Sequence, residues 1–331
     1  MRRIRIALTG TLGLLGNRLA SRLEDDGSCM RVVLLDLAPP APEFRKARYY
    51  RVDLTEPSAS ARMAEALDRE RVDVIVHLAF LQHPARNPGY AHELESLGTM
   101  YLLHALVQLG RSCIAPHLVL GSSTLVYGAG PEHPSLLSEE APLAGRRDYS
   151  LVSGKVDAER QAERYHEAEG GAVTVLRAAP ILSPGARTLA GRYLTLPAVP
   201  TILGFDPMVQ ALTLGDAVEA FHAAIQRAVA IGGKGPLRAF NVCADGVLPL
   251  HAAIRLCGRR PVPLLRFAAA RMFDALFQVG LAIAPSAHLD YLQFPCIADG
   301  RRARAELGFA PRLSTRDALV EFARTRLLDA A

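Results

Sequence analysis

A glycine-rich segment near the N-terminus has the residue types and the spacing that a phosphate site requires. Gly10, Gly13 and Gly16 recur every three residues, between an apolar run at residues 4–8 and a helical pattern at residues 16–23. Glycines at this spacing allow a tight turn, a close approach of the backbone to a pyrophosphate, and tight packing of the helix on the strand. The start of the helix also supplies amide donors and the positive end of its dipole. The segment therefore predicts a dinucleotide site.

An acidic residue further along the chain indicates which dinucleotide would bind. Asp36 follows the second apolar run, residues 31–35, and lies 20 residues after Gly16. A carboxylate at this point accepts hydrogen bonds from both ribose hydroxyls and repels a 2′-phosphate. The sequence thus predicts NAD rather than NADP as the cofactor. The alternative is an ordinary helix-capping aspartate after a strand.

Three further segments, together with the glycine motif, resemble the extended short-chain dehydrogenase/reductases, the NAD-dependent epimerase/dehydratase group. Val52-Asp53-Leu54 and His77-Leu78-Ala79-Phe80 are similar to family segments that lie along the cofactor. The segment GSSTLVYG, residues 121–128, closely matches a third family segment, with Gly121 at the position of its first serine. The resemblance extends from residue 1 to about residue 325. It implies a doubly wound parallel (Rossmann) sheet with a smaller C-terminal substrate domain.

The same resemblance implies a set of cofactor contacts along these segments. Asp53 would approach the adenine amino group. The implied cofactor-binding residues are Gly10, Leu12, Gly13, Leu14, Leu15, Gly16, Asp36, Asp53, Leu54, Leu78, Ala79, Phe80, Lys155, Pro180 and Ile181.

The chemistry of the family requires a Tyr and a Lys four residues apart on one helix, with a Ser or Thr nearby. The Tyr hydroxyl exchanges a proton with the substrate oxygen while hydride moves to or from NAD. Ser123 falls at the Ser position, Tyr149 lies close to the Tyr position, and Lys155 follows six residues later. Side chains six residues apart on a helix lie roughly 120° apart, so this pair cannot share one regular helical face.

Two registers remain open for this helix. If Lys155 occupies the family's Lys position, Glu159 matches a family Glu and Leu151 replaces the Tyr. Tyr149 then reaches the site only if the helix starts late or bulges. If Tyr149 occupies the Tyr position instead, Ser153 replaces the Lys. In both registers the Tyr/Lys pair is broken.

Other family positions at the reacting end of the site also differ. Glu95 and Pro180 stand where the family has Asn, and Thr213 stands where it has His. Glu95 is a candidate substitute acid/base, because a carboxylate buried near a cofactor has a raised pKa. The alternative is a glutamate on a helix surface. Arg192 is a candidate for binding a substrate phosphate, with an ordinary surface arginine as the alternative.

The expected function is an NAD-dependent oxidoreductase, epimerase or dehydratase acting on a nucleotide sugar or another small alcohol or ketone. Ser123 would hold the substrate oxygen, Tyr149 would be the acid/base, and Lys155 would bind the nicotinamide ribose. One alternative is a non-redox NAD-binding sensor or scaffold. Another is an enzyme with a recycled or structural NAD, in which Glu95 transfers the proton. The resemblance also suggests a homodimer through helices around residues 91–108 and 150–167.

The elements that must position these residues alternate between short apolar runs and helical stretches, as in a parallel sheet. Strands are expected at residues 4–8, 31–35, 72–77, 117–120, 172–176 and 239–242. The NAD-binding domain is expected at residues 1–184 plus about 213–248, and the substrate-binding domain at about 185–212 and 249–331. Residues 267–283 predict an amphipathic helix whose apolar face packs into the core, covers a substrate as a lid, or contacts a membrane.

The composition excludes several other classes of protein. Half of the 331 residues are hydrophobic and 21% are charged, which is typical of a globular chain. The net charge of +5 comes from scattered arginines rather than a basic tail, so no nucleic-acid partner is expected. Five widely spaced cysteines without a metal-binding pattern predict no metal and a reducing cytoplasm. The chain has no apolar run of about 18 residues, so no membrane-spanning helix is expected.

Overall fold

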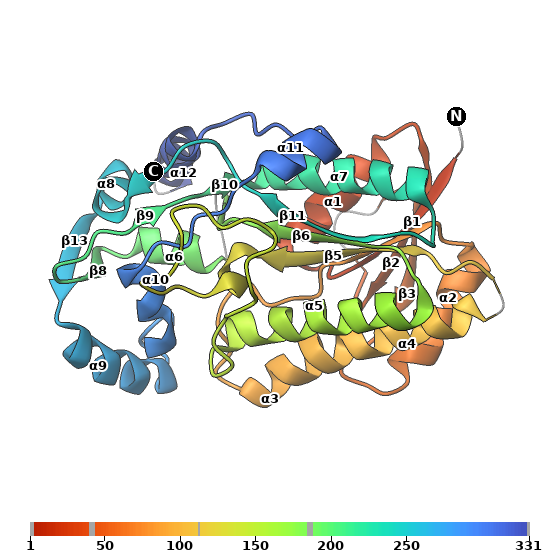
Figure 1. Cartoon of the computed structure of the whole chain (residues 1–331), viewed down its shortest axis with the longest axis horizontal. Coiled ribbons are helices and arrows are strands. Elements are labelled where there is room, and N and C mark those ends of the chain that lie inside the picture. The colour runs from red at the N-terminus through yellow and green to blue at the C-terminus, as the bar shows by residue number, and fades with distance from the viewer. Residues whose placement is uncertain (1–2, 40–43, 112, 184–187, 330–331) are drawn as a thin grey trace.

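A seven-stranded parallel sheet forms the larger part of the molecule (Figure 1). The computed structural model describes residues 3–39, 44–111, 113–183 and 188–329. The predicted domain boundary at residues 184–185 lies outside these ranges. In order across the sheet, the strands are β11 (Leu237–Val242), β6 (Val173–Ala178), β5 (His117–Ser123), β4 (Val74–His77), β1 (Ile4–Thr9), β2 (Cys29–Asp36) and β3 (Ala47–Arg51).

Helices cover both faces of this sheet, which confirms the predicted doubly wound fold. Figure 1 shows α1 (Leu14–Glu24), α7 (Leu214–Ile231) and α11 (Arg301–Leu307) on one face. The helices α2 (Ala59–Glu70), α4 (Gly98–Gly110) and α5 (Ser150–Glu169) cover the other. Because connections between parallel strands run over the faces, the carboxyl ends of all seven strands meet at one edge of the sheet.

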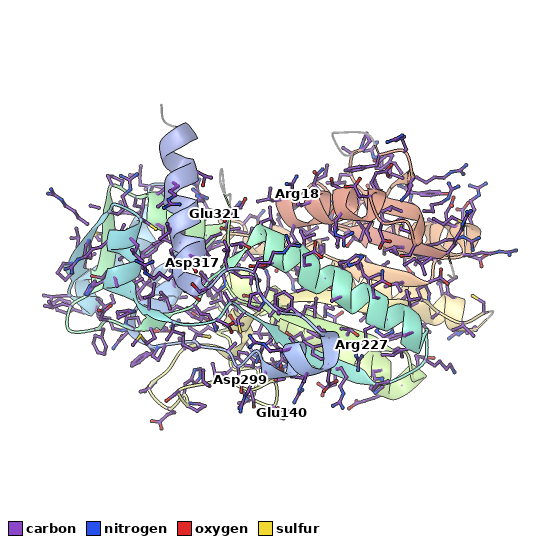
Figure 2. The ribbon with its side chains drawn as sticks, turned by 90° about the horizontal axis from the view of Figure 1, so that it is seen from above. Arg18, Glu140, Arg227, Asp299, Asp317 and Glu321 are labelled. Carbon is purple, nitrogen blue, oxygen red and sulfur yellow. The ribbon has the colours of Figure 1, made fainter. Side chains whose placement is uncertain are left out.

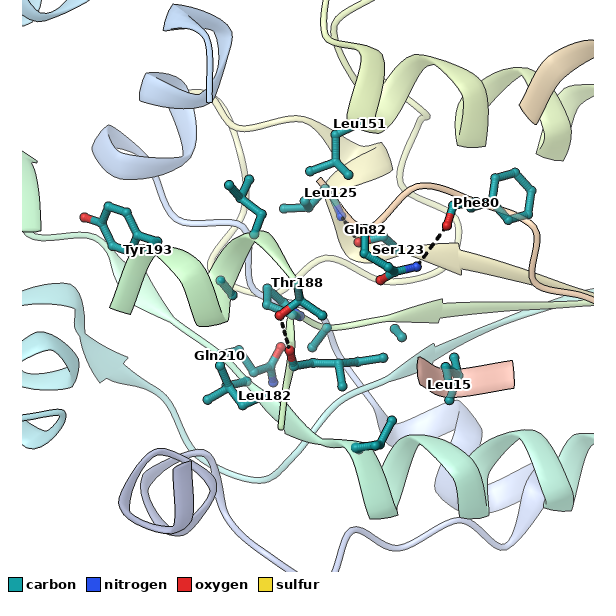
Figure 3. A pocket seen from close by; sticks show the side chains of 18 of the residues that line it. Leu15, Phe80, Gln82, Ser123, Leu125, Leu151, Leu182, Thr188, Tyr193 and Gln210 are labelled. Carbon is teal, nitrogen blue, oxygen red and sulfur yellow. Dashed lines mark hydrogen bonds between the residues drawn. The ribbon is translucent and has the colours of Figure 1, made fainter. Parts of the chain in front are cut away.

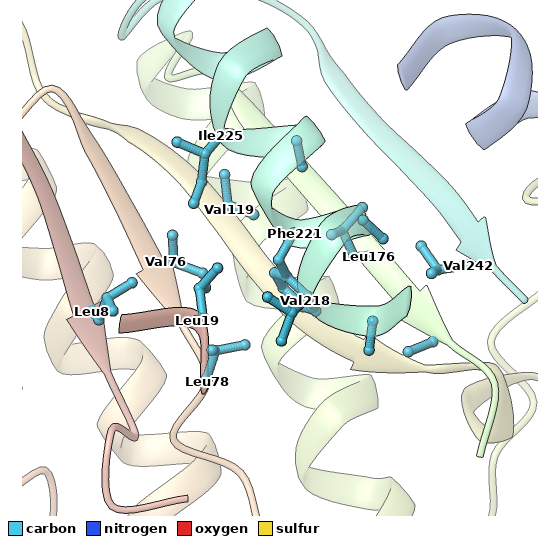
Figure 4. Packing of buried hydrophobic residues seen from close by; sticks show 14 of the residues in the cluster. Leu8, Leu19, Val76, Leu78, Val119, Leu176, Val218, Phe221, Ile225 and Val242 are labelled. Atoms are coloured by element: carbon cyan, nitrogen blue, oxygen red, sulfur yellow. The ribbon is translucent and has the colours of Figure 1, made fainter. Parts of the chain in front are cut away.

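The core of the first face forms where α7 packs on the middle strands. Phe221 and Ile225 of α7 lie against Leu78, Val119 and neighbouring residues of the cluster (Figure 4). Their spacing of four residues is that of one helical face. Each such buried side chain contributes roughly 1.5–3 kcal/mol to folding.

Charged side chains lie on the outside of the same layer. Figure 2, seen from above, shows Arg18 and Arg227 on helices of this face and Glu140 and Asp299 in its loops. Arg227 donates to Glu306 of α11 at 3.4 Å. Basic and acidic side chains are thus mixed on this face.

The smaller part of the molecule contains short sheets and helices beside the carboxyl edge of the large sheet. Its strands are paired as β8 (Ala198–Ile202) with β13 (Arg260–Leu264) and β9 (Met208–Val209) with β12 (Leu248–Pro249). A third pair, β7 (Ile181–Leu182) with β10 (Leu212–Thr213), lies where the two parts meet. Its helices are α6 (Leu189–Thr195), α8 (Leu250–Leu256), α9 (Arg266–Gln278), α10 (Leu289–Gln293) and α12 (Thr315–Asp329).

The amphipathic segment predicted around residues 267–283 forms α9. Phe273 and Phe277 are buried, whereas Phe267 and Met272 on the same helix are exposed. The helix therefore contributes to the core with one stripe only. Among the described residues, no helix has both the length and the apolar character needed to cross a membrane.

Candidate functional site

A cavity of about 250 Å³ lies at the carboxyl edge of the sheet, between the sheet and the smaller part (Figure 3). Its wall combines the glycine segment after β1, the end of β5 with Ser123, and Leu151 and Lys155 of α5. Residues of α6, α8 and α10 close the opposite side. Ligands of open α/β sheets bind at this edge of the sheet.

The glycine segment forms a turn that only glycine can complete at two of its positions. Gly10 has a φ of 72°, and a Cβ there would lie 2.5 Å from the backbone carbonyl carbon of Leu78. A Cβ at Gly16 would lie 2.3 Å from the carbonyl oxygen of Gly10. Gly13 precedes the first residue of α1, and that helix has neither a side-chain cap nor an acidic residue in its first turn. Free amide groups at the start of α1 therefore fit a pyrophosphate.

Asp36 is tied to this turn by hydrogen bonds. Its Oδ2 accepts from the Leu12 amide and from the Thr11 hydroxyl, both at 3.1 Å. Its Oδ1 accepts from the Leu37 amide at 2.9 Å. The carboxylate thus stands at the end of β2 beside the glycine turn, where the adenosine ribose of a dinucleotide belongs.

The structure places most, but not all, of the predicted cofactor residues on the cavity wall. Those that line the cavity are Gly10, Gly13, Leu14, Leu15, Gly16, Leu78, Phe80, Lys155, Pro180 and Ile181. Those that lie outside its wall are Leu12, Asp36, Asp53, Leu54 and Ala79. Asp53 accepts from the amide and the hydroxyl of Thr55, at 2.9 and 2.7 Å, and so closes a turn after β3.

Among the described residues that line the cavity, Lys155 is the only Lys, Arg, Asp or Glu. Its Nζ donates to the carbonyl oxygens of Leu81 and Leu151, both at 3.1 Å, and lies 3.7 Å from Glu95 Oε1. Burial lowers the pKa of this ammonium, while the Glu95 carboxylate opposes the shift. A lysine with a lowered pKa gives up its proton more readily than an ordinary lysine.

Glu95 lies behind Lys155 and is fully buried, so the helix-surface alternative is wrong. It belongs to a π-helical stretch, His92–Leu97, and its Oε1 accepts from the Leu81 amide at 2.6 Å. Its Oε2 has no hydrogen-bond partner among the described residues. Burial raises the pKa of this carboxyl group, against the lowering effect of Lys155. Glu95 does not line the cavity itself, but it contacts two residues that do, Lys155 and Leu81.

Close packing of α5 on Glu95 depends on a glycine. A Cβ at Gly154 would lie 2.1 Å from Glu95 Oε2. Gly154 therefore lets the helix that carries Lys155 approach the buried carboxylate.

Tyr149 lies immediately before α5, because the helix begins at Ser150. Its side chain is completely buried, and its hydroxyl lies 3.0 Å from His288 Nδ1. Burial raises the pKa of this phenol well above its ordinary value. Tyr149 is absent from the cavity wall, where Leu151 and Lys155 lie together. The structure thus brings Ser123 and Lys155 to one cavity but leaves Tyr149 outside it.

The two serines at the end of β5 differ in their surroundings. Ser123 lines the cavity, and its Oγ accepts from the Leu125 amide at 3.3 Å (Figure 3). No described residue accepts a hydrogen bond from its hydroxyl. Ser122 donates to Glu159 at 2.5 Å, and Glu159 also pairs with Arg177 at 2.7 Å. Ser122 is therefore part of a buried structural network, whereas Ser123 can donate to a ligand.

Several wall residues had no signal in the sequence. Gln82 follows β4, His288 lies immediately before α10, and Tyr291 lies on α10. They come from separate segments with no motif around them, so only the fold shows that they share a cavity. Within the described ranges, no three His, Cys, Asp or Glu side chains are grouped in a way that could hold a metal ion.

A glycine turn after the first strand, an acid at the end of the second and a cavity at the strand ends define a dinucleotide-binding Rossmann protein. A model of the NAD-dependent epimerase/dehydratase family matches residues 6–243. The chain belongs to this family, and its cofactor is NAD. The resemblance of the sequence motifs to that family is thereby confirmed.

Relatives in mycobacteria match the chain over nearly its whole length. Uncharacterized protein Rv0501 of Mycobacterium tuberculosis (strain ATCC 25618 / H37Rv) is 32% identical over 333 residues, which is 97% of this chain and 84% of the relative. Uncharacterized protein Mb0513 of Mycobacterium bovis matches with the same values.

Solved structures with a similar fold include a nucleotide-sugar epimerase and a dehydratase. A UDP-glucose 4-epimerase of Thermotoga maritima, solved with UDP-glucose, has a TM-score of 0.71 and 18% identity and covers 99% of this chain and 100% of its own. DesIV of Streptomyces venezuelae, a dTDP-glucose 4,6-dehydratase solved with NAD, has a TM-score of 0.73 and 18% identity, with 98% coverage of both chains. At these identities the likeness shows the fold.

Proposed function

We propose that the protein is an NAD-dependent oxidoreductase, of the epimerase, dehydratase or reductase type, that acts on the alcohol or ketone group of a small molecule. One observation carries this proposal: Ser123 and Lys155 line the same cavity as the glycine turn. When bound, NAD supplies a carbon that accepts or donates hydride. The protein must then bind the substrate oxygen and move its proton.

Two side chains perform these tasks in our proposal. Ser123 donates its hydroxyl to the substrate oxygen and fixes its position. Lys155 binds beside it as the ammonium and gives up or takes back the proton, since its lowered pKa reduces the cost of the transfer. Leu151 occupies the place where a tyrosine would act, so Lys155 takes over the proton transfer. Tyr149 in this account supports the fold through His288.

In our proposal the Glu95 carboxylate raises the pKa of Lys155, and replacing Glu95 tests this role. We expect Glu95→Gln to move the high-pH limb of the kcat/KM profile to lower pH. The Glu95 carboxylate raises the pKa of Lys155, so its removal leaves the lowering effect of burial unopposed. The acid form of Lys155 is then lost at a lower pH, and activity falls there. The pH dependence of NADH oxidation, with a carbonyl compound found by screening, measures the shift.

Glu93→Gln is the matched control, because Glu93 lies in the same stretch with its side chain exposed. Its pH profile should equal that of the unaltered protein. An unchanged profile for Glu95→Gln, or an equal shift for Glu93→Gln, contradicts the tuning role.

A second candidate function is an NAD-binding sensor or scaffold without redox chemistry. It is favoured by Leu151 at the tyrosine position and by the burial of Tyr149 away from the cavity. Under this alternative, no compound from a broad set of carbonyls and sugar nucleotides would change the absorbance of NADH in the presence of the protein.

The proposal extends to domains, assembly and location. We propose residues 1–184 plus about 213–248 as the NAD-binding domain and the remainder as the substrate domain.

We propose a homodimer through α4 and α5, supported by a shallow hollow between them whose wall includes Met100, Leu103, Val107 and Tyr165. Light scattering should give twice the 35.7 kDa chain mass, and a monomer would contradict the dimer. A cytoplasmic location is supported by five free cysteines.

A further inference from the structure

We propose that the cavity takes an apolar substrate with one ketone or alcohol group, rather than a nucleoside diphosphate sugar. The inference rests on the proposed function, because it names the substrate of the same site. The wall of the cavity opposite the glycine turn supports this assignment. That wall is made largely of aliphatic side chains, among them Leu125, Leu182, Leu194, Leu250 and Leu292.

The wall offers a diphosphate no counter-charge among the described residues. Phosphate recognition uses arginine forks, lysines or helix N-termini. Lys155 lies at the reacting end beside Ser123, and the Glu95 carboxylate at 3.7 Å already balances its charge. Arg192, the candidate from the sequence, is exposed on α6 and is not part of the wall. Burying two phosphate charges against leucines would remove their hydration and supply no counter-charge in return, which is strongly unfavourable.

Three polar side chains on the same side of the cavity already have partners within the protein. The Tyr193 hydroxyl donates to the Pro200 carbonyl oxygen at 2.6 Å. The Tyr291 hydroxyl donates to the Leu125 carbonyl oxygen at 2.7 Å. Gln210 donates to the Ala244 carbonyl oxygen at 3.2 Å. These side chains therefore complete the wall instead of offering hydrogen bonds to a uracil ring or a sugar.

Three polar side chains that can meet a ligand, Ser123, Lys155 and Gln82, lie at the reacting end. His288 also lines the cavity, with its Nδ1 3.0 Å from the Tyr149 hydroxyl. Ser123 retains a free hydroxyl hydrogen, and Lys155 lies on the same wall. Gln82 donates to the Phe80 carbonyl oxygen at 3.2 Å through Nε2, and its carbonyl oxygen accepts from no described residue (Figure 3). One polar end and apolar walls match a hydrocarbon skeleton that carries one oxygen, whose burial gains roughly 25 cal/mol per Å² of apolar surface.

Calorimetry with the NAD-loaded protein tests the assignment with two probes. One is trans-1-decalone, a bicyclic ketone without charge, and the other is UDP-glucose. We expect decalone to bind at least about tenfold more tightly than UDP-glucose, a difference of about 1.4 kcal/mol. Tighter binding of UDP-glucose, or no binding of decalone, overturns the apolar assignment and leaves the proposed redox function standing. Failure to load NAD instead overturns the proposed function itself.

A pair of variants on α6 tests whether the ketone binds in the cavity. Ala190 lines the cavity, and Arg192 on the same helix is exposed. Ala190→Phe adds a ring to the chamber and should weaken decalone binding about tenfold or more, with NAD affinity and Tm unchanged. Arg192→Phe should leave both ligands unaffected. Equal decalone affinity in Ala190→Phe and the unaltered protein would contradict binding in this chamber.

Discussion

Replacing Gly13 with Ala is expected to weaken NAD binding about 100-fold, or about 2.7 kcal/mol, while the protein stays folded. Gly13 lines the cavity at the start of α1, and its φ of −76° suits any residue. An added Cβ would meet the protein only at the Gly10 oxygen, at 3.1 Å. The methyl group would therefore displace a ligand phosphate more than it strains the turn. Titration with NADH, followed by nicotinamide fluorescence, measures the affinity, and Tm reports the fold.

Gly27→Ala is the control for this change, because a Cβ at Gly27 would have no heavy atom within 4 Å. It should bind NADH like the unaltered protein. Gly10→Ala is less informative, since its clash with the Leu78 backbone would disturb the turn itself. Normal NADH affinity in Gly13→Ala would contradict the position of the ligand phosphate at this turn.

Replacing Lys155 with Met is expected to lower kcat about 1,000-fold, because the acid that serves the substrate oxygen is lost. Methionine keeps the apolar stem of the side chain. Glu95 then loses its neighbouring charge, and burial has already raised the pKa of its carboxyl, so it takes up a proton and stays buried as a neutral group. The variant should therefore fold and bind NADH within about tenfold of the unaltered affinity. NADH oxidation with the best carbonyl compound from a screen measures the loss.

Tyr149→Phe is the contrasting variant. Its hydroxyl faces His288 rather than the cavity, so turnover should stay within about threefold of the original. The lost buried hydrogen bond should cost about 1 kcal/mol of stability, which a lowered Tm would show. Loss of turnover in Tyr149→Phe, together with an active Lys155→Met, would move the acid/base role back to Tyr149.

Sequence periodicity predicted most of the large sheet because its central strands are buried on both faces. Runs such as residues 4–8 and 117–120 are mostly apolar, with one basic residue or histidine each, and can be recognised without a structure. The edge strand β3 was missed. Its sequence ARYYR is short, and its side chains are half-buried or exposed, so no apolar run marks it. The glycine turn and Asp36 were predictable because their chemistry depends on local spacing.

The residues at the reacting end were harder to predict. Whether such a side chain faces the cavity, the core or the solvent depends on where its helix begins and how regular the helix is. The run from His92 to Glu95 reads as a surface, yet a π-helical stretch turns Glu95 inward. Such stretches form i→i+5 hydrogen bonds, which change the direction of the residues they contain. Tyr149 likewise lies where α5 begins, so its direction follows the contact with His288 rather than the helical period. The apolar wall depends on segments far apart in the chain, which no local pattern connects.

Mass spectrometry of the supernatant from freshly purified, denatured protein tests the nucleotide site most directly. We expect NAD or NADH without NADP, because Asp36 stands beside the glycine turn where a 2′-phosphate would lie. A mixture of both oxidation states would further support redox chemistry at Lys155 and Ser123. NADP in place of NAD, or no nucleotide together with no NADH binding on titration, would contradict an NAD site at the glycine turn.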